Sequence, residues 1–519
     1  MSCYVFPLVF VSVFILLIWW YIMAKFSYWT KRGIPYLCPS FPYGNIKEVG
    51  RTLHIAELMK SVYDKFKSSG QPFAGIYYFI RPVAVVTDPN LARDILIKHF
   101  IHFNDRGVYS NEIDDPISAH LFSLEGDRWK EVRKVVAPLF SQQRIKSYHE
   151  DILKVSSRLR SRIDAKLSHS ANIDITDLSA RYIIDAIGRC VFGINPNCIW
   201  DDEALLGKVS RRIFTMSPLE TLRHLFMQTF RESARSLHMK LIKKDVADFF
   251  RGLSDKSGEN WTKEVYSFVQ LLEELRKGGK LSSNQVTAQA FIFFVAGFET
   301  SAITLAYCLH ELAWNPSIQD RLRAEVFAQV GMGGKLSWDA INKMTFLNAV
   351  VNETLRKYPP GGNFLRVARE DFRINEKVIE KDTLVIIPLY GIHRDASIYP
   401  NPDTFDPERP QLGRNCCSFM PFGDGPRHCI GRRLALHQIK LAISSLIVNY
   451  HFRPPPLSFY NITLSKSTVL LAPQHPIHLT MEHIRDEASP YQQLRQQNSH
   501  TLMDAIRGEM IPLAATIAK

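Results

Sequence analysis

Cysteine is scarce in this sequence, and paired Cys-x-x-Cys motifs are absent. The eight cysteines are Cys3, Cys38, Cys190, Cys198, Cys308, Cys416, Cys417 and Cys429, spread over 519 residues. A disulfide scaffold needs a much higher density, so reduced thiols are expected. Internal repeats and low-complexity tracts are also absent between residues 45 and 480. This part of the chain is expected to fold as one body, although a prior of ~150 residues per domain allows about three.

The composition excludes several broad classes of protein. Apolar residues make up 46% and charged residues 22%, which is ordinary globular usage and rules out a disordered, collagenous or polytopic membrane protein. The 64 Lys and Arg residues exceed the 51 Asp and Glu residues, which gives a net charge of +13. This excess favours an acidic partner, anionic lipid or nucleic acid, and does not choose among them.

Charge is missing from the first two dozen side chains. The apolar run from Tyr4 to Ala24 is long enough to span a bilayer as a helix, and it lacks the positive start and small cleavage-site residues of a signal peptide. Residues 1–24 therefore predict a retained single-pass transmembrane anchor. Lys25 and Arg32 follow this run, so the positive-inside rule places the remaining chain in the cytosol. The alternative is a buried helix of a globular core.

Three further segments follow the predicted anchor. Residues 25–44 contain Pro35, Pro39 and Pro42, which predict a stiff hinge. Residues 45–481 are expected to form a catalytic domain, and residues 482–519 form a tail without an assigned role.

The periodicity of residues 45–481 predicts a mainly α fold with small β-sheets. Apolar residues recur at helical spacing in 85–100, 127–165, 176–193 and 284–314. Strand-like runs lie around Arg81-Pro82, in 372–388 and in 450–480.

The segment from Pro421 to Gly431, Pro-Phe-Gly-Asp-Gly-Pro-Arg-His-Cys-Ile-Gly, is the most specific one in the chain. Gly423 and Gly425 permit a tight backbone path, and the helix expected after Gly431 directs its amides and its positive dipole end towards Cys429. These features stabilise a thiolate, which is a metal ligand.

This segment has two other interpretations, a zinc site and a phosphate-binding loop. Cys416, Cys417, His428 and Cys429 could form a zinc site, but the paired spacing is missing. The Gly-Asp-Gly sequence lacks the Lys-Ser/Thr ending of a phosphate loop.

The pattern Phe422-Gly-x-Gly-x-Arg427-x-Cys429-x-Gly431 resembles in full the haem-binding loop of the cytochrome P450 family of haem-thiolate monooxygenases. The resemblance continues over roughly residues 30–480. It implies the cytochrome P450 fold, a single body that encloses haem b (iron protoporphyrin IX). Cys429 would be the axial iron ligand, and Phe422 would contact the haem.

The sequence Ala296-Gly-Phe-Glu299-Thr300 lies in the expected helix 284–314. Gly297 should cost ~1 kcal/mol relative to Ala, and we expect it to open a groove for a small ligand beside the Thr300 hydroxyl. A kinked core helix with a polar rim is the alternative. The segment resembles the oxygen-activating helix of the family, which implies that Glu299 and Thr300 relay protons to iron-bound O2.

Glu353 and Arg356 are spaced to meet on one face of a helix that ends at Pro359-Pro360. Apolar neighbours argue for burial, although this motif is usually a solvated pair. The segment from Phe405 to Pro410 resembles the family's arginine-bearing loop, which implies a structural network of Glu353, Arg356 and Arg409. Pro410 departs from the family pattern, where an aromatic residue is common.

Buried haem carboxylates need cations or hydrogen-bond donors. The Trp129-x-x-x-Arg133 sequence resembles the family helix that approaches a haem propionate. Arg366 and Arg427 align with other propionate-binding arginines of the family.

The resemblance also implies the partners and the location. Electrons would come from NADPH through NADPH–cytochrome P450 reductase at the endoplasmic reticulum membrane, with cytochrome b5 as a possible second donor. The reductase would dock on the cysteine side of the haem, near Lys130, Lys134, Arg432, Arg433 and Lys440. Haem carboxylates, anionic lipid and an acidic reductase account for the charge of +13, so no nucleic acid is expected.

The closest likeness within the family is to insect microsomal members that oxidise xenobiotics such as plant toxins and insecticides. Residues 99–129 and the 296–301 segment carry it. This likeness implies a pocket for a hydrophobic small molecule lined by Phe122, Phe293, Phe294, Ala296 and Phe364, although such aromatic clusters are often plain core. The alternatives are hydroxylation of an endogenous hormone or lipid, a haem-thiolate isomerase or dehydratase, and a non-enzymatic, membrane-tethered haem-binding protein.

Overall fold

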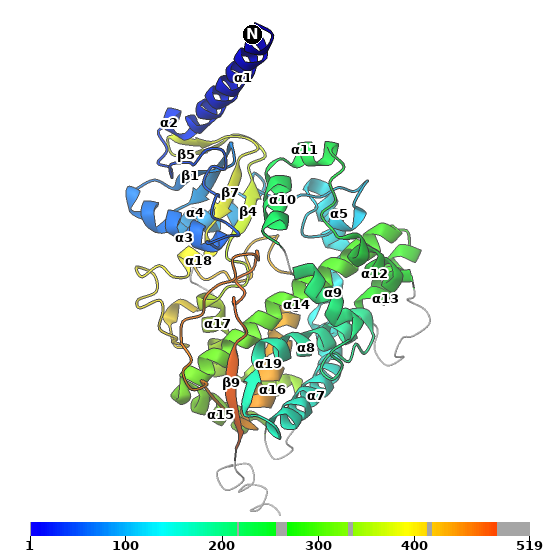
Figure 1. The fold of residues 1–519 in the computed structure, drawn as a ribbon. Coiled ribbons are helices and arrows are strands. Elements are labelled where there is room, and N and C mark those ends of the chain that lie inside the picture. Colours follow the sequence, from blue (N-terminus) through cyan, green and yellow to red (C-terminus); the bar gives the residue numbers. More distant parts are fainter. Residues whose placement is uncertain (1, 215–216, 256–266, 331–335, 413–417, 485–519) are drawn as a thin grey trace, which may run out of the picture.

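A computed structural model describes residues 2–214, 217–255, 267–330, 336–412 and 418–484 of the chain. A mainly helical body carries small sheets, and helix α1 projects from it (Figure 1). The α-helices are α1 Ser2–Phe26, α2 Tyr28–Lys31, α3 Ile55–Phe66, α4 Pro89–Leu96, α5 Gly126–Val136, α6 Gln142–Ser147, α7 His149–Leu167, α8 Ile175–Ile187, α9 Leu205–Phe214, α10 Pro218–Thr229, α11 Arg231–Ser236, α12 Lys244–Asp255, α13 Phe268–Lys277, α14 Ser283–Trp314, α15 Pro316–Val330, α16 Trp338–Lys343, α17 Thr345–Lys357, α18 Leu389–Ile392 and α19 Arg432–Ile447.

The strands form three sheets. They are β1 Phe73–Tyr78, β2 Arg81–Val86, β3 Asn172–Asp174, β4 Phe364–Val367, β5 Phe372–Ile374, β6 Lys377–Ile379, β7 Leu384–Ile387, β8 Tyr450–Arg453 and β9 His478–His483. The largest sheet has the order β1-β2-β7-β4, in which β2 and β7 are parallel and the other pairs are antiparallel. The other sheets are β3-β9-β8 and β5-β6. A mainly α fold with small sheets is therefore confirmed.

Several predicted boundaries differ from the observed ones. The predicted helix 85–100 begins later, because Val85 and Val86 pair with β1 and α4 starts only after the N-cap Asp88. The predicted helix 127–165 is divided into α5, α6 and α7, with a 3₁₀ segment containing Pro138 after α5. Proline lacks the amide hydrogen that a continuous helix would need.

Helix α14 forms the centre of the helical part and packs on α8 and α19 (Figure 1). It begins where Ser282 and Gln285 form a reciprocal capping box. Within the described part of the chain, α14 is the helix whose length and composition would allow a membrane crossing. However, 67% of its most apolar window is buried, which is typical of a core helix.

Helix α1 leaves its apolar side chains uncovered. Phe10, Leu16 and Trp20 are 68%, 61% and 66% exposed, in a helix that extends away from the body (Figure 1). The stretch Ser12–Phe26 is a shorter apolar helix than a full bilayer span requires. The apolar helix is therefore present, whereas its membrane role stays a prediction.

The segment predicted as a hinge makes specific contacts with the body. Trp29 is buried, and its indole nitrogen donates a hydrogen bond of 3.0 Å to the carbonyl oxygen of Ile76 in β1. A Cβ on Gly75 would lie 2.4 Å from the Trp29 ring, so the ring occupies the space that the glycine leaves. Arg32 pairs with Glu380. The described residues of this segment are therefore attached to the sheet, rather than forming a bare extended connector.

Candidate active site

Cys429 lies in a tight loop directly before α19. Gly423 and Gly425 have φ angles of 71° and 67°, and the Cys429 amide donates a hydrogen bond of 2.8 Å to the carbonyl oxygen of Phe422. A Cβ on Gly425 would lie 2.0 Å from the carbonyl oxygen of Leu96, so only glycine fits there. The predicted backbone role of the two glycines is confirmed.

The Cys429 side chain is exposed, yet protein surrounds it closely enough for burial to raise the pKa of the thiol. Hydrogen bonds from the Gly431 and Arg432 amides lower that pKa, as do the charges of Arg106 and Arg133. The Cys429 thiol is accessible but is surrounded by protein atoms, so it faces a space inside the molecule. Its amide and guanidinium neighbours favour the thiolate.

One face of α14 is open in the middle of the core. Ala296 is exposed and Thr300 is partly exposed, although α14 is mostly buried. The Thr300 hydroxyl donates a hydrogen bond of 2.7 Å to the carbonyl oxygen of Ala296. Residues four apart share a helix face, so the predicted alignment of these two residues is confirmed.

Gly297 was predicted to open the groove beside Thr300, but the structure gives it a different role. A Cβ on this glycine would lie 3.0 Å from Cδ1 of Ile187, so its missing side chain lets α8 pack closely on α14. The opening lies over Ala296 and Thr300 instead.

Burial raises the pKa of Glu299 to about 7. A carboxyl in this range exchanges a proton near neutral pH, which is the property that a proton relay requires.

Four arginines gather near Cys429. Arg366 on β4 and Arg427 in the cysteine loop are both 3% exposed, and the positive charge of Arg427 contributes to lowering the pKa of Arg366. Burial lowers the pKa of Arg366 to about 9 and that of Arg427 to about 10. Arg133 donates to the carbonyl oxygen of His428 at 3.3 Å. Arg106, the fourth, interacts with Cys429 and the other three.

Several donors of this cluster have no protein acceptor. They are Nε of Arg366 and both Nε and Nη1 of Arg427. Asp105 accepts a hydrogen bond from Arg427 at 3.4 Å, and its single negative charge offsets only part of the positive charge of the four arginines. Trp129 is buried, with the Arg427 guanidinium 4.1 Å from its ring centroid. The structure thus brings together all four residues that the sequence assigned to haem carboxylates.

Glu353, Arg356 and Arg409 form a fully connected network. Arg356 donates to both carboxylate oxygens of Glu353, at 2.7 and 2.8 Å, and Arg409 donates to Glu353 at 3.1 Å. The side chains of Glu353 and Arg356 are 0% exposed. Arg356 also donates to the carbonyl oxygens of His393 and Pro402, each at 2.8 Å. The predicted geometry is present, and it connects α17 to the chain before the cysteine loop.

Comparison with known proteins agrees with this geometry. The profile of the cytochrome P450 family matches residues 39–481. "Probable cytochrome P450 6a14" of Drosophila melanogaster is 36% identical over 88% of this chain and 96% of its own length. "Probable cytochrome P450 6a23" of the same species is 37% identical over 88% and 95%. "Cytochrome P450 6A1" of Musca domestica is 36% identical over 90% and 96%.

The chain belongs to the cytochrome P450 family. It is a monooxygenase with a haem-thiolate cofactor, and it resembles the insect members. The residues present fit that cofactor, because buried arginine donors without acceptors match two haem carboxylates, and the axial Cys429 is flanked by donors that favour a thiolate. When bound, the haem iron activates O2.

Arg106 is the member of this P450 site that sequence reasoning missed. It lies in no motif by which the family was recognised, and a single arginine in a loop carries no periodicity signal. Its position next to Asp105 and at the start of a stretch resembling insect members was the available hint.

Two of the predicted pocket residues point elsewhere. Phe294 is fully buried, with its ring against those of Phe192, Phe250 and Phe298. Phe293 is 8% exposed and contacts the rings of Phe140 and Phe268. Both side chains belong to the core, which was the alternative for such an aromatic cluster.

The open face of α14 instead includes Ile292 and Val295, which are both partly exposed and flank Ala296. Phe122 is 44% exposed, and Phe364 is partly exposed. The Phe364 ring would lie 3.7 Å from a Cβ on Gly423, so it reaches the cysteine loop.

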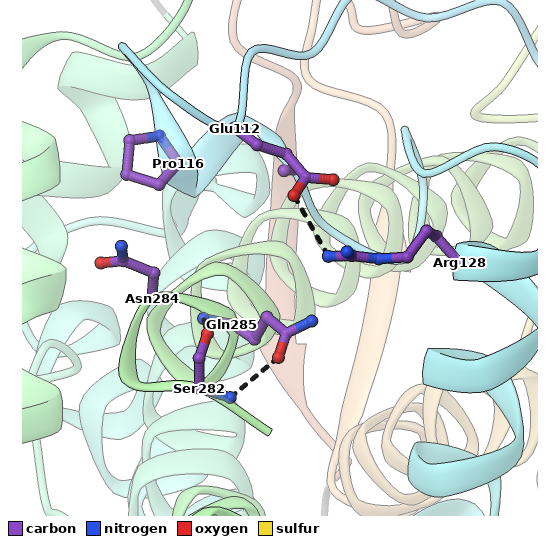
Figure 2. A pocket seen from close by; sticks show the side chains of 7 residues that line it. Glu112, Pro116, Arg128, Ser282, Asn284 and Gln285 are labelled. Atoms are coloured by element: carbon purple, nitrogen blue, oxygen red, sulfur yellow. Dashed lines mark hydrogen bonds and ion pairs between the residues drawn. The ribbon is translucent and has the colours of Figure 1, made fainter. Parts of the chain in front are cut away.

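A pocket of 340 Å³ with a mostly polar lining lies at the beginning of α14, and its lining side chains are drawn in Figure 2. Arg128 and Glu112 form an ion pair of 3.1 Å at this pocket. Its lining is polar and none of the predicted site residues contributes to it.

The zinc reading depends on Cys416 and Cys417, which lie outside the described residues. In the described part of the chain, no group of three or more His, Cys, Asp and Glu side chains could hold a metal ion.

Proposed function

We propose that this P450 inserts one atom of O2 into hydrophobic xenobiotics, such as plant toxins and insecticides. Electrons would come from NADPH through NADPH–cytochrome P450 reductase, with cytochrome b5 as a second donor. The observation that supports this proposal is the open, apolar face of α14 around Ala296, together with a Cys429 whose amide and arginine neighbours favour the thiolate against the effect of burial. Ile292, Val295 and Phe122 add apolar surface for an uncharged substrate.

The roles of the site residues follow from their positions. Trp129, Arg133, Arg366, Arg427 and Arg106 would hold the haem carboxylates, and Phe422 would contact the haem beside Cys429. Thr300 and Glu299 would position water and carry protons towards bound O2. The presence of this acid–alcohol pair disfavours an isomerase or dehydratase, which has no need for O2-linked proton delivery.

The proposed reductase face lies on the cysteine side. Lys134, Arg432 and Arg433 are exposed there, and Lys130 pairs with Asp127 in an exposed position. Lys440 is only 7% exposed, and burial lowers its pKa to about 8, so it does not belong to a docking surface. Scattered cations of this kind favour an acidic partner by steering its approach.

For the location, we propose that residues 1–24 anchor the chain in the endoplasmic reticulum membrane, with the catalytic domain of residues 45–481 on the cytosolic face. The uncovered apolar side chains of α1 support this placement, as does Lys25 at its end.

A product assay tests the proposed function. The full chain, reconstituted with NADPH–cytochrome P450 reductase and lipid, is given a panel of plant toxins, insecticides, steroids and fatty acids. Mono-oxygenated products from several unrelated xenobiotics are expected, and they should require both NADPH and O2. Turnover of a single steroid or fatty acid would instead favour an endogenous hormone or lipid hydroxylase. If no product forms, the remaining alternative is a non-enzymatic haem-binding protein.

Replacement of Glu299 tests its raised pKa. The folded-state pKa of about 7 exceeds the value of an unfolded glutamate, so the folded state holds an extra proton between about pH 4.5 and 7. The wild type should therefore lose stability relative to Glu299→Gln across this window, by at most about 1.4 kcal/mol per pH unit. The Tm of Glu299→Gln minus that of the wild type should rise from pH 5 to pH 7 and level off above it. A constant difference would contradict a raised pKa.

A further inference from the structure

Arg106 makes contacts that its proximity to the haem carboxylate site does not explain. Its guanidinium carbon lies 4.3 Å from the centroid of the Phe122 ring. Its Nη1 donates to the carbonyl oxygen of Phe122 at 3.0 Å, and its Nη2 donates to the carbonyl oxygen of Arg427 at 3.1 Å. One side chain therefore joins the loop that carries Phe122 to the cysteine loop, two residues before Cys429.

The backbone around Phe122 is held from two further sides. The Leu121 amide donates to the side-chain oxygen of Gln289 on α14 at 3.0 Å. Arg427 donates to the carbonyl oxygen of Leu124 at 2.8 Å. These bonds fix the path of the loop but do not touch the Phe122 ring, which is 44% exposed. The Arg106 guanidinium is a contact that the ring itself makes.

We propose that Arg106 is a positioning residue that sets the orientation of the Phe122 ring over the substrate space. The inference rests on the proposed function, in which Phe122 lines the pocket. A planar guanidinium can stack on a ring and donate to two carbonyl groups at the same time, and two of its five donors are used here. The remaining donors stay available to a haem carboxylate. A lysine would keep the charge but lose the flat face and the fork.

A double-mutant cycle in the holoenzyme separates this role from charge balance at the haem. The variants are Arg106→Lys, Phe122→Ala and the double variant. The readout is the Kd of 4-phenylimidazole, whose nitrogen would bind the haem iron and whose phenyl ring would extend into the space that Phe122 is proposed to line. The Soret shift on titration measures this Kd without turnover.

We expect Arg106→Lys to change the Kd about 5-fold in the wild-type background and less than about 1.5-fold in the Phe122→Ala background. Arg133→Lys is the matched control, because Arg133 also lies near Cys429 but donates to the carbonyl oxygen of His428. Its effect should be equal in both backgrounds. An equal effect of Arg106→Lys in both backgrounds, or no effect in either, would overturn the proposal.

Haem content is measured from the absorbance of each variant. If Arg106→Lys does not retain haem, Arg106→Gln keeps a planar donor and repeats the cycle with the same two outcomes. If the cycle shows no coupling between Arg106 and Phe122, the product assay can still show xenobiotic oxidation. If the product assay shows no turnover, the ligand Kd of each variant can still be measured. The two experiments therefore distinguish failure of this inference from failure of the proposed function.

Discussion

Arg356→Ala is expected to prevent accumulation of the folded haem protein. The substitution removes five hydrogen bonds from a fully buried guanidinium: two to Glu353 and one each to the carbonyl oxygens of His393, Pro402 and Thr404. Glu353 keeps Arg409 and the Asp406 amide, but it loses its bidentate partner. Breaking a buried ion pair costs about 3–5 kcal/mol, and total stability is about 5–15 kcal/mol. Soluble holoprotein per cell and its urea midpoint measure the loss.

The chain contains its own matched control for this substitution. Glu273 and Arg276 have the same spacing as Glu353 and Arg356, and they form an ion pair of 2.6 Å on α13. The Arg276 side chain is 42% exposed, so Arg276→Ala should cost at most about 0.5 kcal/mol. If both variants accumulate equally well, the buried network does not stabilise the fold.

Gly425→Ala is expected to disrupt the cysteine loop. The φ of 67° already disfavours alanine by about 1–2 kcal/mol. The added Cβ would also lie 2.0 Å from the carbonyl oxygen of Leu96, a backbone atom that cannot rotate away. The loop must therefore shift and move Cys429, four residues further on. We expect most of the haem to be lost, measured as haem absorbance per mole of purified protein.

Gly279→Ala separates backbone strain from steric clash. Gly279 has a similar φ of 72°, but nothing lies within 4 Å of its Cβ position. This variant should lose about 1–2 kcal/mol of stability and keep its full haem content. Equal haem loss in both variants would show that strain alone, rather than contact with Leu96, explains the need for glycine.

The parts of the site that depend on local sequence could be predicted. The cysteine loop is a contiguous segment whose glycines determine its backbone path, so the need for glycine at positions 423 and 425 could be predicted. The Glu353–Arg356 pair could also be predicted, because helical spacing brings the charges together and apolar neighbours indicate burial.

The parts that depend on helix rotation and tertiary packing could not be predicted. A shift of one residue turns a side chain by about 100° around the helix axis, which separates the buried Phe293 from the open Ile292. The reason for Gly297 lies in Ile187 on another helix, far away in sequence. Arg106 joins two loops, and no spacing rule within one segment reports such a contact.

The attachment of the segment after α1 to the large sheet also could not be predicted from the sequence. Three prolines indicated an extended path, but the burial of Trp29 depends on the gap that Gly75 leaves in β1. The residues around Trp29 give no indication that its ring packs against a strand that lies far away in the sequence.

The reduced carbon monoxide difference spectrum of the full chain and of Cys429→Ser tests the central claim most directly. A thiolate ligand donates electron density to the haem iron and shifts the Soret band of this complex to the red. We predict that red-shifted band for the wild type and its complete loss in Cys429→Ser, whose hydroxyl is a poor substitute for a thiolate. A red-shifted band that persists in Cys429→Ser would contradict the assignment of Cys429 as the axial ligand.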